Sequence, residues 1–239
     1  MVYFSQALDL GRKNIMLSYD YIPVNGHVVA NVRGRKFLVD MGIPQTIARR
    51  PLVIEGQRLP VTTEGHGLKL QDFNHIVGIE LDGVLGAQLS NEFVVNVLPN
   101  DKTLVLDHYQ PEFPICIEVD NLSGMPFMHQ SVDHKRVRGL INLGSALSWI
   151  QPELVDNHQS IGTAKELFGY IGEREVEVYS LPVMVDRQTI YLKFGAMPKP
   201  VGEWLQLANI DTILGAELLQ HYAISMALSE GTVSMDTLH

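Results

Sequence analysis

The chain is organised around the stretch Arg35-Lys36-Phe37-Leu38-Val39-Asp40-Met41-Gly42-Ile43-Pro44-Gln45-Thr46. A related pattern returns at Arg138-Gly139-Leu140-Ile141-Asn142-Leu143-Gly144-Ser145. In each copy an apolar run is followed by a polar residue, an apolar residue and a glycine. Such a run is typical of a strand covered on both faces, and the glycine lets the backbone turn sharply after it. We therefore expect Asp40 and Asn142 at bends, where their side chains can face a cleft.

The similarity between the two copies extends along the chain and predicts an internal duplication. Asp40 and Asn142 are 102 positions apart, and at the same offset His27 falls on His129. A second match, at an offset of 129, pairs residues 81–89 with residues 210–218. The difference between the two offsets leaves 27 additional residues in the second copy. Each copy then ends in two apolar runs joined by a turn, which predicts closing hairpins at residues 93–107 and 222–236.

Together these motifs resemble the retropepsin-like and pepsin-like aspartic protease family. The matching motifs are Asp40-Met41-Gly42 with Val84-Leu85-Gly86, and Asn142-Leu143-Gly144 with Ile213-Leu214-Gly215. The resemblance covers residues 21–107 and 123–236. It implies a mainly β, two-lobed acid-protease fold with pseudo-twofold symmetry, closed β-barrel-like lobes and short helices. It also implies that each lobe contributes one side chain of a catalytic pair at the floor of a peptide cleft.

Turn residues and prolines suggest how the lobes are divided. Pro111 and Pro114 lie in residues 108–122, which match neither copy, so we expect a linker there and lobes at 1–110 and 111–239. Asn25-Gly26 predicts a hairpin leading to Asp40, residues 46–52 a short connection, and residues 88–92 one helical turn. For residues 1–20 the pattern decides no conformation.

The 27 additional residues of the second lobe lie between positions 155 and 209. Residues 175–184 and 189–194 have the pattern of a strand pair, and Met197-Pro198-Lys199-Pro200 reads as a loop after it. We expect this insertion to lengthen one wall of the cleft.

The predicted catalytic positions are Asp40 and Asn142, and the second is degenerate. In this family two carboxyl groups share one proton, so that one activates a water and the other acts as the acid. The amide of Asn142 is neutral and cannot relay a proton. Because general acid–base catalysis contributes roughly 10²–10⁴-fold per group, we expect hydrolysis to be lost or much reduced.

The predicted binding residues surround this pair. Met41 and Leu143 stand where the family carries hydroxyls that link the lobes, and they could pack against each other instead. Gly42, Gly144 and Ser145 complete the two tips. Residues 59–70 read as a hairpin around Gly65-His66-Gly67, at the place where the resemblance implies a flap over bound peptide.

Other polar residues have simpler interpretations. Asp82 and Asp211 match between the copies and are expected to hydrogen-bond turns. Arg33, Lys36, Lys135 and Arg138 also match and are expected to face water. The nine histidines form no zinc motif and no glycine run resembles a nucleotide loop, so we expect neither metal nor cofactor.

Composition limits the partners. The 239 residues carry a net charge of −9, with a pI near 5.4, which argues against nucleic acid or an anionic membrane as partner. Cys116 is the single cysteine, so no disulfide forms within the chain. No apolar stretch has the length of a signal peptide or a membrane span. From these two observations we expect a cytoplasmic protein.

Three functions follow from these observations. The first is a degenerate protease fold that binds an extended peptide or protein segment in its cleft. The second is an active aspartic endopeptidase in which Asp40 orients a water, alone or paired with Asp40 of a second copy, so both monomer and homodimer are considered. The third is a structural scaffold or assembly protein, whose cleft would be filled by its own side chains.

Overall fold

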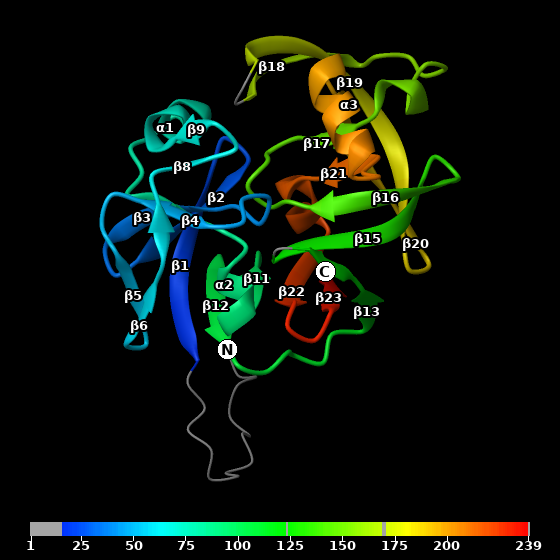
Figure 1. Ribbon diagram of the computed structural model, residues 1–239. Helices are drawn as coiled ribbons and strands as arrows, with labels where there is room; N and C mark the ends of the chain where they lie inside the picture. Colours follow the sequence, from blue (N-terminus) through cyan, green and yellow to red (C-terminus); the bar gives the residue numbers. More distant parts are fainter. Residues whose placement is uncertain (1–15, 123, 169–170, 239) are drawn as a thin grey trace.

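The computed structural model describes residues 16–122, 124–168 and 171–238, and shows two lobes built mainly of strands (Figure 1). This confirms the predicted mainly β, two-lobed architecture. Residues 1–15, which include most of the N-terminal segment without a predicted conformation, lie outside the described residues. Among the described residues, no helix combines the length and the apolar composition needed to cross a bilayer.

From residue 16 onward, where its description begins, the first lobe contains twelve strands and two short helices. Its strands are β1 Leu17–Val24, β2 His27–Val32, β3 Arg35–Val39, β4 Thr46–Ala48, β5 Leu52–Ile54, β6 Gln57–Leu59, β7 Val61–Thr62, β8 Glu64–Gly65, β9 Leu68–Lys69, β10 Gly83–Leu85, β11 Val94–Leu98 and β12 Thr103–Asp107. The helices are α1 Leu70–Val77 and α2 Leu89–Glu92. The predicted short connection at residues 46–52 is wrong in part, because β4 lies within it and pairs with β10.

Local sequence explains several of these elements. Asn25 and Gly26 have φ values of 49° and 83°, the left-handed pair that a two-residue hairpin between β1 and β2 requires. Helix α1 buries Leu70, Phe73 and Val77 on one side and ends at Gly78 with φ 82°. Helix α2 confirms the predicted helical turn.

The second lobe follows the same plan with a larger insertion. Its strands are β13 Ile115–Glu118, β14 Asp120–Leu122, β15 Met125–Val132, β16 Lys135–Ile141, β17 Ser148–Ile150, β18 Gly162–Phe168, β19 Gly172–Val185, β20 Gln188–Ala196, β21 Thr212–Leu214, β22 Tyr222–Ala227 and β23 Thr232–Thr237. Its helical elements are η1 Pro152–Leu154, α3 Lys199–Leu207 and η2 Ala216–Gln220.

Two predictions for this lobe need correction. The strand pair is confirmed as β19 and β20, but the loop predicted at 197–200 is wrong in its second half, since α3 begins at Lys199 with Pro200 in its first turn. Proline is tolerated there because the first helical N–H groups have no partner within the helix. The predicted linker 108–122 is also partly wrong, because β13 pairs with β23 and β14 pairs with β15.

The duplication is visible in the strand pairing. In the first lobe β10 runs parallel to β3 and antiparallel to β4, with Val84 opposite Leu38. In the second lobe β21 runs parallel to β16 and antiparallel to β17, with Ile213 opposite Leu140. Corresponding residues therefore occupy corresponding places in the two lobes.

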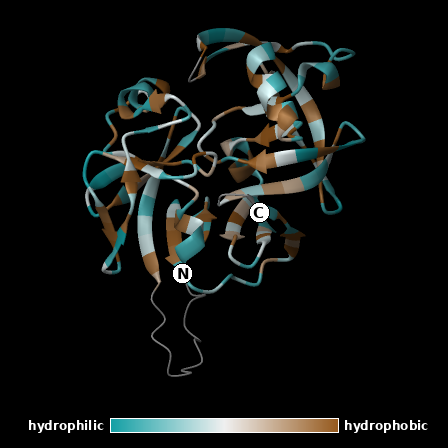
Figure 2. Ribbon diagram, viewed as in Figure 1, coloured by the Kyte–Doolittle hydropathy of each residue, from teal (hydrophilic) through white to brown (hydrophobic). Residues whose placement is uncertain are grey.

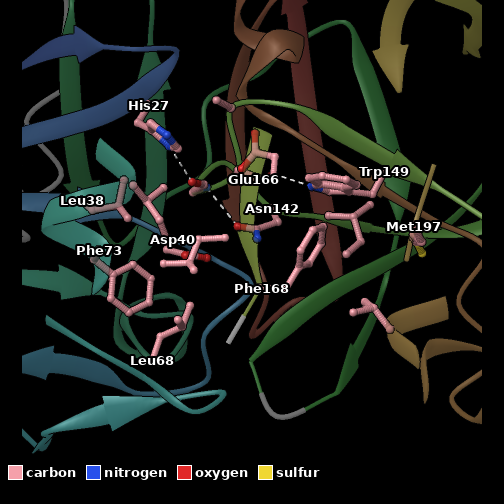
Figure 3. Close-up of a pocket in the computed structure, with 17 residues that line it drawn as sticks. His27, Leu38, Asp40, Leu68, Phe73, Asn142, Trp149, Glu166, Phe168 and Met197 are labelled. Carbon is pink, nitrogen blue, oxygen red and sulfur yellow. Dashed lines mark hydrogen bonds between the residues drawn. The ribbon is translucent and has the colours of Figure 1, made fainter. Parts of the chain in front are cut away.

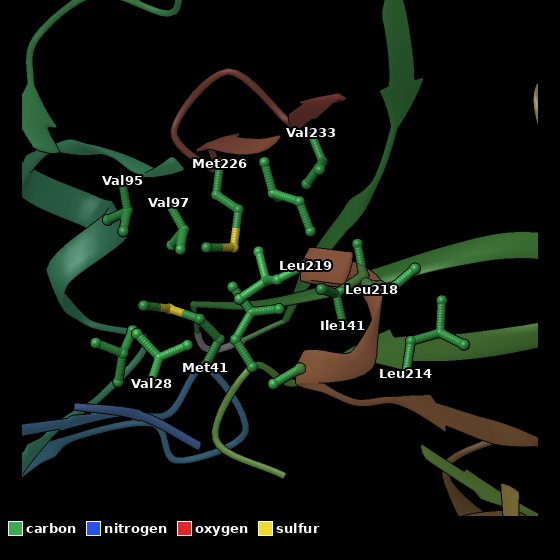
Figure 4. Packing of buried hydrophobic residues seen from close by; sticks show 14 of the residues in the cluster. Val28, Met41, Val95, Val97, Ile141, Leu214, Leu218, Leu219, Met226 and Val233 are labelled. Carbon is green, nitrogen blue, oxygen red and sulfur yellow. The ribbon is translucent and has the colours of Figure 1, made fainter. Parts of the chain in front are cut away.

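A shared sheet joins the lobes. Strands β11 and β22, which correspond in the two copies, pair antiparallel with Asn96 opposite Ser225. One hydrophobic cluster runs across this junction, where Met41, Val95 and Val97 of the first lobe meet Leu218 and Met226 of the second (Figure 4). Apolar strands gather around the same junction, whereas much of α1 is hydrophilic (Figure 2). The junction thus fixes the tips of β3 and β16 relative to each other.

Candidate active site

Asp40 and Asn142 occupy equivalent positions at the ends of β3 and β16. The Asp40 N–H donates to the Leu85 carbonyl at 2.9 Å, and the Asn142 N–H donates to the Leu214 carbonyl at 2.8 Å. Each residue is thereby held by the strand beside it, β10 or β21. The structure brings the two predicted catalytic positions together at one seam between the lobes (Figure 3).

The two tips interlock through their glycines. The Gly42 N–H donates to Asp40 Oδ1 at 2.9 Å and to Asn142 Oδ1 at 3.1 Å, and the Gly144 N–H donates to Asn142 Oδ1 at 2.9 Å. A Cβ on Gly42 would collide with the Asn142 amide, and one on Gly144 would collide with the Asp40 carboxyl. Only glycine allows the backbone of each lobe to approach the other lobe's side chain so closely.

The environment of Asp40 favours its neutral form. Burial raises the pKa of Asp40 to about 6, although hydrogen bonds from Gly42 and Asn142 and the charge of His66 act to lower it. Asn142 is partly buried and neutral. The seam therefore holds one titratable carboxyl group facing a carboxamide, with no second acid between the tips.

Two histidines of the first lobe contact the glycine carbonyls of the tips. His27 Nδ1 lies 2.8 Å from the Gly144 carbonyl oxygen, and His66 Nε2 lies 2.9 Å from that of Gly42. Burial lowers the pKa of His27, so its neutral ring donates from Nδ1. The role of His27 was not predicted. The repeat pairs His27 with His129, but His129 is exposed. The correspondence between the two copies therefore did not reveal the contact that His27 makes.

The predicted hairpin around Gly65-His66-Gly67 is present as β8 and β9. His66 and Gly67 form its turn, with φ values of 50° and 75°. Besides contacting Gly42, the His66 ring lies edge-on to Trp204 of α3, with 6.3 Å between the ring centroids. The hairpin tip thus contacts the first-lobe tip and a helix of the second lobe.

The positions after Asp40 and Asn142 belong to the core. Met41 and Leu143 are fully buried in the cluster that joins the lobes, so apolar packing stands where hydroxyls were expected. Hydroxyls act instead six residues after each tip position, at Thr46 and Ser148. Thr46 Oγ1 accepts from the Gly86 N–H at 3.2 Å, and Ser148 Oγ accepts from the Gly215 N–H at 3.0 Å. The offset of 102 could have revealed this pair.

Asp82 and Asp211 have the predicted structural role. Asp82 Oδ2 accepts from the Lys36 N–H at 2.9 Å, and Asp211 Oδ2 accepts from the Arg138 N–H at 2.8 Å. Both carboxylates therefore secure a backbone N–H of the strand that leads to a tip, near the start of β3 and in the middle of β16. The Arg138 guanidinium also contacts Asp120 at 3.1 Å, so this residue is more than a solvated charge.

A cavity of about 180 Å³ opens above the two tips (Figure 3). Of the predicted site residues, it is lined by Asp40, Asn142, Gly144 and Ser145. Ser145 Oγ accepts from Trp149 Nε1 at 2.9 Å, which fixes the indole in the wall. The other lining residues are His27, Leu38, Leu68, Phe73, Ile76, Ala146, Trp149, Glu166, Leu167, Phe168, Met197, Val201 and Ile213.

The remaining predicted binding residues lie around this cavity rather than on its surface. Met41 and Leu143 are in the core, while Gly42, Gly65, His66 and Gly67 form the floor and the hairpin beside it. Trp149, Glu166 and Phe168 were missed. Glu166 and Phe168 lie on β18, which belongs to the insertion and has no counterpart in the repeat, whereas Trp149 lies on β17 and matches the aliphatic Ile47 at the offset of 102. Within residues 16–122, 124–168 and 171–238, no three histidine, cysteine or acidic side chains are placed to hold a metal ion.

Comparison with solved structures places this geometry in a known architecture. An aspartic proteinase from Irpex lacteus superposes with a TM-score of 0.54 over 93% of this chain and 97% of its own, at 10% identity. The chain has the fold of an aspartic proteinase. A retropepsin-like aspartic protease from Rickettsia conorii matches 52% of this chain and 92% of its own, at 13% identity and a TM-score of 0.36. Neither a family model nor a curated protein matches the sequence.

Proposed function

We propose that this protein binds an extended peptide or protein segment in the cleft between its lobes, with peptide hydrolysis lost or much reduced. The observation that carries the proposal is the pairing of Asp40 with Asn142 at interlocked tips. The site keeps the backbone arrangement of a catalytic seam and lacks the second acid. Asn142 can donate a hydrogen bond as a protonated carboxyl does, but it has no proton to transfer.

The surroundings of the seam support binding. The cavity above it is lined mainly by apolar side chains with a few polar groups, the usual composition of a ligand site. The hairpin β8–β9 stands beside it as a separate two-stranded sheet. An extended segment could add to such a strand edge through backbone hydrogen bonds, a mode of recognition that needs no catalytic proton.

An active endopeptidase is the second candidate, and the pKa of Asp40 favours it. A carboxyl group with a pKa raised to about 6 is a stronger base than an ordinary aspartate and could activate a water near neutral pH. Slow hydrolysis by Asp40 alone is then the expected activity. The scaffold hypothesis receives less support, because the side chains of residues 16–122, 124–168 and 171–238 leave the cavity above the tips open.

Digestion of a peptide library distinguishes these candidates. The natural chain, Asp40→Ala and Asn142→Asp are each incubated with the library from about pH 4 to about pH 7, and products are read by mass spectrometry. The proposal expects no cleavage above the Asp40→Ala background. Cleavage that Asp40→Ala abolishes would identify an active peptidase. Asn142→Asp restores the second carboxyl group, and any activity gained would show that the missing acid is the limiting feature.

Binding needs its own measurement. The same library, passed over the immobilised natural chain, should leave a retained subset whose sequences share a pattern at alternate positions, as strand addition requires. The matched control is Gly144→Ala, whose methyl group would displace the Asp40 carboxyl at the cavity floor. An equally retained subset on both proteins would argue against binding in the cleft. A monomer or homodimer and a cytoplasmic location remain part of the proposal.

A further inference from the structure

Glu166 occupies an unusual place in the wall of the cavity. It lies on β18 between Ala164 and Phe168, both of which pack against the hydrophobic cluster beneath α3. At this position the strand turns a partly buried carboxyl group into a cavity that Trp149 and Phe168 also line. Figure 3 shows Glu166 near Trp149 and on the same side of the cavity as Asn142.

Neighbouring charges do not offset Glu166. Burial raises its pKa, as expected for a carboxyl group removed from water. Arg174 is its partner in the β18–β19 register, but Arg174 is exposed and its Nη1 donates to the Glu173 carbonyl at 2.8 Å. Within the part of the chain that the structure describes, no salt bridge joins Glu166 to a basic residue.

The charge of the whole cavity has one sign. Its titratable lining residues are Asp40, Glu166 and His27, and His27 is held neutral by burial. Among the described residues that line it there is no lysine or arginine. Two carboxyl groups in a partly enclosed, largely apolar site attract a cation more strongly than the same groups would in open water.

We propose that Glu166 makes this cavity a pocket for a basic side chain of the bound segment, with arginine preferred over lysine. The preference follows from the walls, because the rings of Trp149 and Phe168, 5.0 Å apart and inclined by 69°, offer surfaces for a planar guanidinium. Glu166 is therefore a specificity-determining residue. The inference rests on the proposed peptide-binding function and names the chemistry of its ligand.

Acetyl-arginine amide and acetyl-citrulline amide provide a matched pair of probes, because citrulline has nearly the same shape without the charge. Binding is followed by the fluorescence of Trp149 in a Trp204→Phe background, which removes the other tryptophan. The arginine probe should bind at least about 10-fold more tightly, the size of one charge-assisted hydrogen bond. Glu166→Gln should weaken this preference several-fold, with Asp40 as the remaining acid of the cavity, and the control Arg174→Gln should retain it in full.

Each outcome decides the inference. Equal affinities of the natural chain for the two probes, no binding of the arginine probe, or a preference that Glu166→Gln leaves unchanged would overturn it. The peptide-library experiment separates this failure from that of the proposed function. If peptides are retained without enrichment in arginine or lysine, the basic pocket is rejected and peptide binding stands. If the arginine probe binds but no peptide is retained, peptide binding is rejected and the pocket stands.

Discussion

His27 Nδ1 lies 2.8 Å from the carbonyl oxygen of Gly144, and this buried hydrogen bond joins the two lobes beside the Asp40–Asn142 seam. His27 begins β2 of the first lobe, whereas Gly144 belongs to the second-lobe tip. The contact therefore positions the second-lobe tip against β2 of the first lobe.

Replacing His27 should destabilise the chain. His27→Ala leaves the buried Gly144 carbonyl without its donor, and we expect the free energy of unfolding to fall by about 1–3 kcal/mol. The matched control is His129→Ala, the repeat counterpart, which is exposed and should change stability by less than about 0.5 kcal/mol. Urea titrations of both variants measure these values, and equal effects would contradict a specific role for His27.

Asp40 should make stability depend on pH. Its pKa is about 6 in the folded chain against an ordinary value of 3.8, so between these values the folded chain binds more protons than the unfolded chain. The free energy of unfolding therefore falls as pH rises through this window, by up to about 3 kcal/mol. Asp40→Asn removes this term and should be more stable than the natural chain at pH 7, but not at pH 4.

The difference between the two proteins isolates Asp40 together with its coupling to the charge of His66, because groups without such coupling titrate equally in both. His27, whose pKa is lowered by burial, opposes Asp40 by destabilising the fold in acid, and this effect cancels in the comparison. Unfolding measured at several pH values gives the difference directly. A difference that stays constant with pH would show that Asp40 is not buried in its charged form.

The two strand-securing aspartates should be energetically equivalent. Asp82→Ala and Asp211→Ala each remove a carboxylate that accepts one backbone N–H, at 2.9 Å and 2.8 Å. We expect each to cost about 1 kcal/mol. Asp101→Ala, at an exposed turn of the first lobe, is the control for loss of charge alone. Clearly unequal costs, measured by thermal or urea unfolding, would argue against equivalent roles in the two copies.

His66 should hold the β8–β9 hairpin against the floor of the site. His66→Ala removes the contact with the Gly42 carbonyl and the edge contact with Trp204, so amide hydrogen exchange should accelerate across β8 and β9. His75→Ala, an exposed histidine on the adjacent helix α1, provides the control. Unchanged exchange in the hairpin of the His66 variant would mean that its tip is held by other contacts.

Local patterns were sufficient for most of the fold. Asn25-Gly26 predicted a hairpin because its two residues tolerate left-handed backbone angles. The offset that pairs Asp40 with Asn142 in the sequence also pairs β3 with β16, and these strands occupy equivalent places in the two lobes. Helix α3 was missed because Pro198 and Pro200 resemble loop residues, although proline also begins helices. The linker was misplaced because β13 is defined by its pairing with β23, more than a hundred residues away.

The candidate site, like the fold, was predictable from the sequence only in part. By itself the sequence determined the duplication, the identities of the two tip residues and the absence of a second acid, since these are properties of residue type and spacing. Only the tertiary structure decided that His27 bonds to Gly144, that Met41 and Leu143 are buried in the core, and that Glu166 enters the cavity wall. Those relationships join residues far apart in the chain, and their geometry depends on how the two lobes pack.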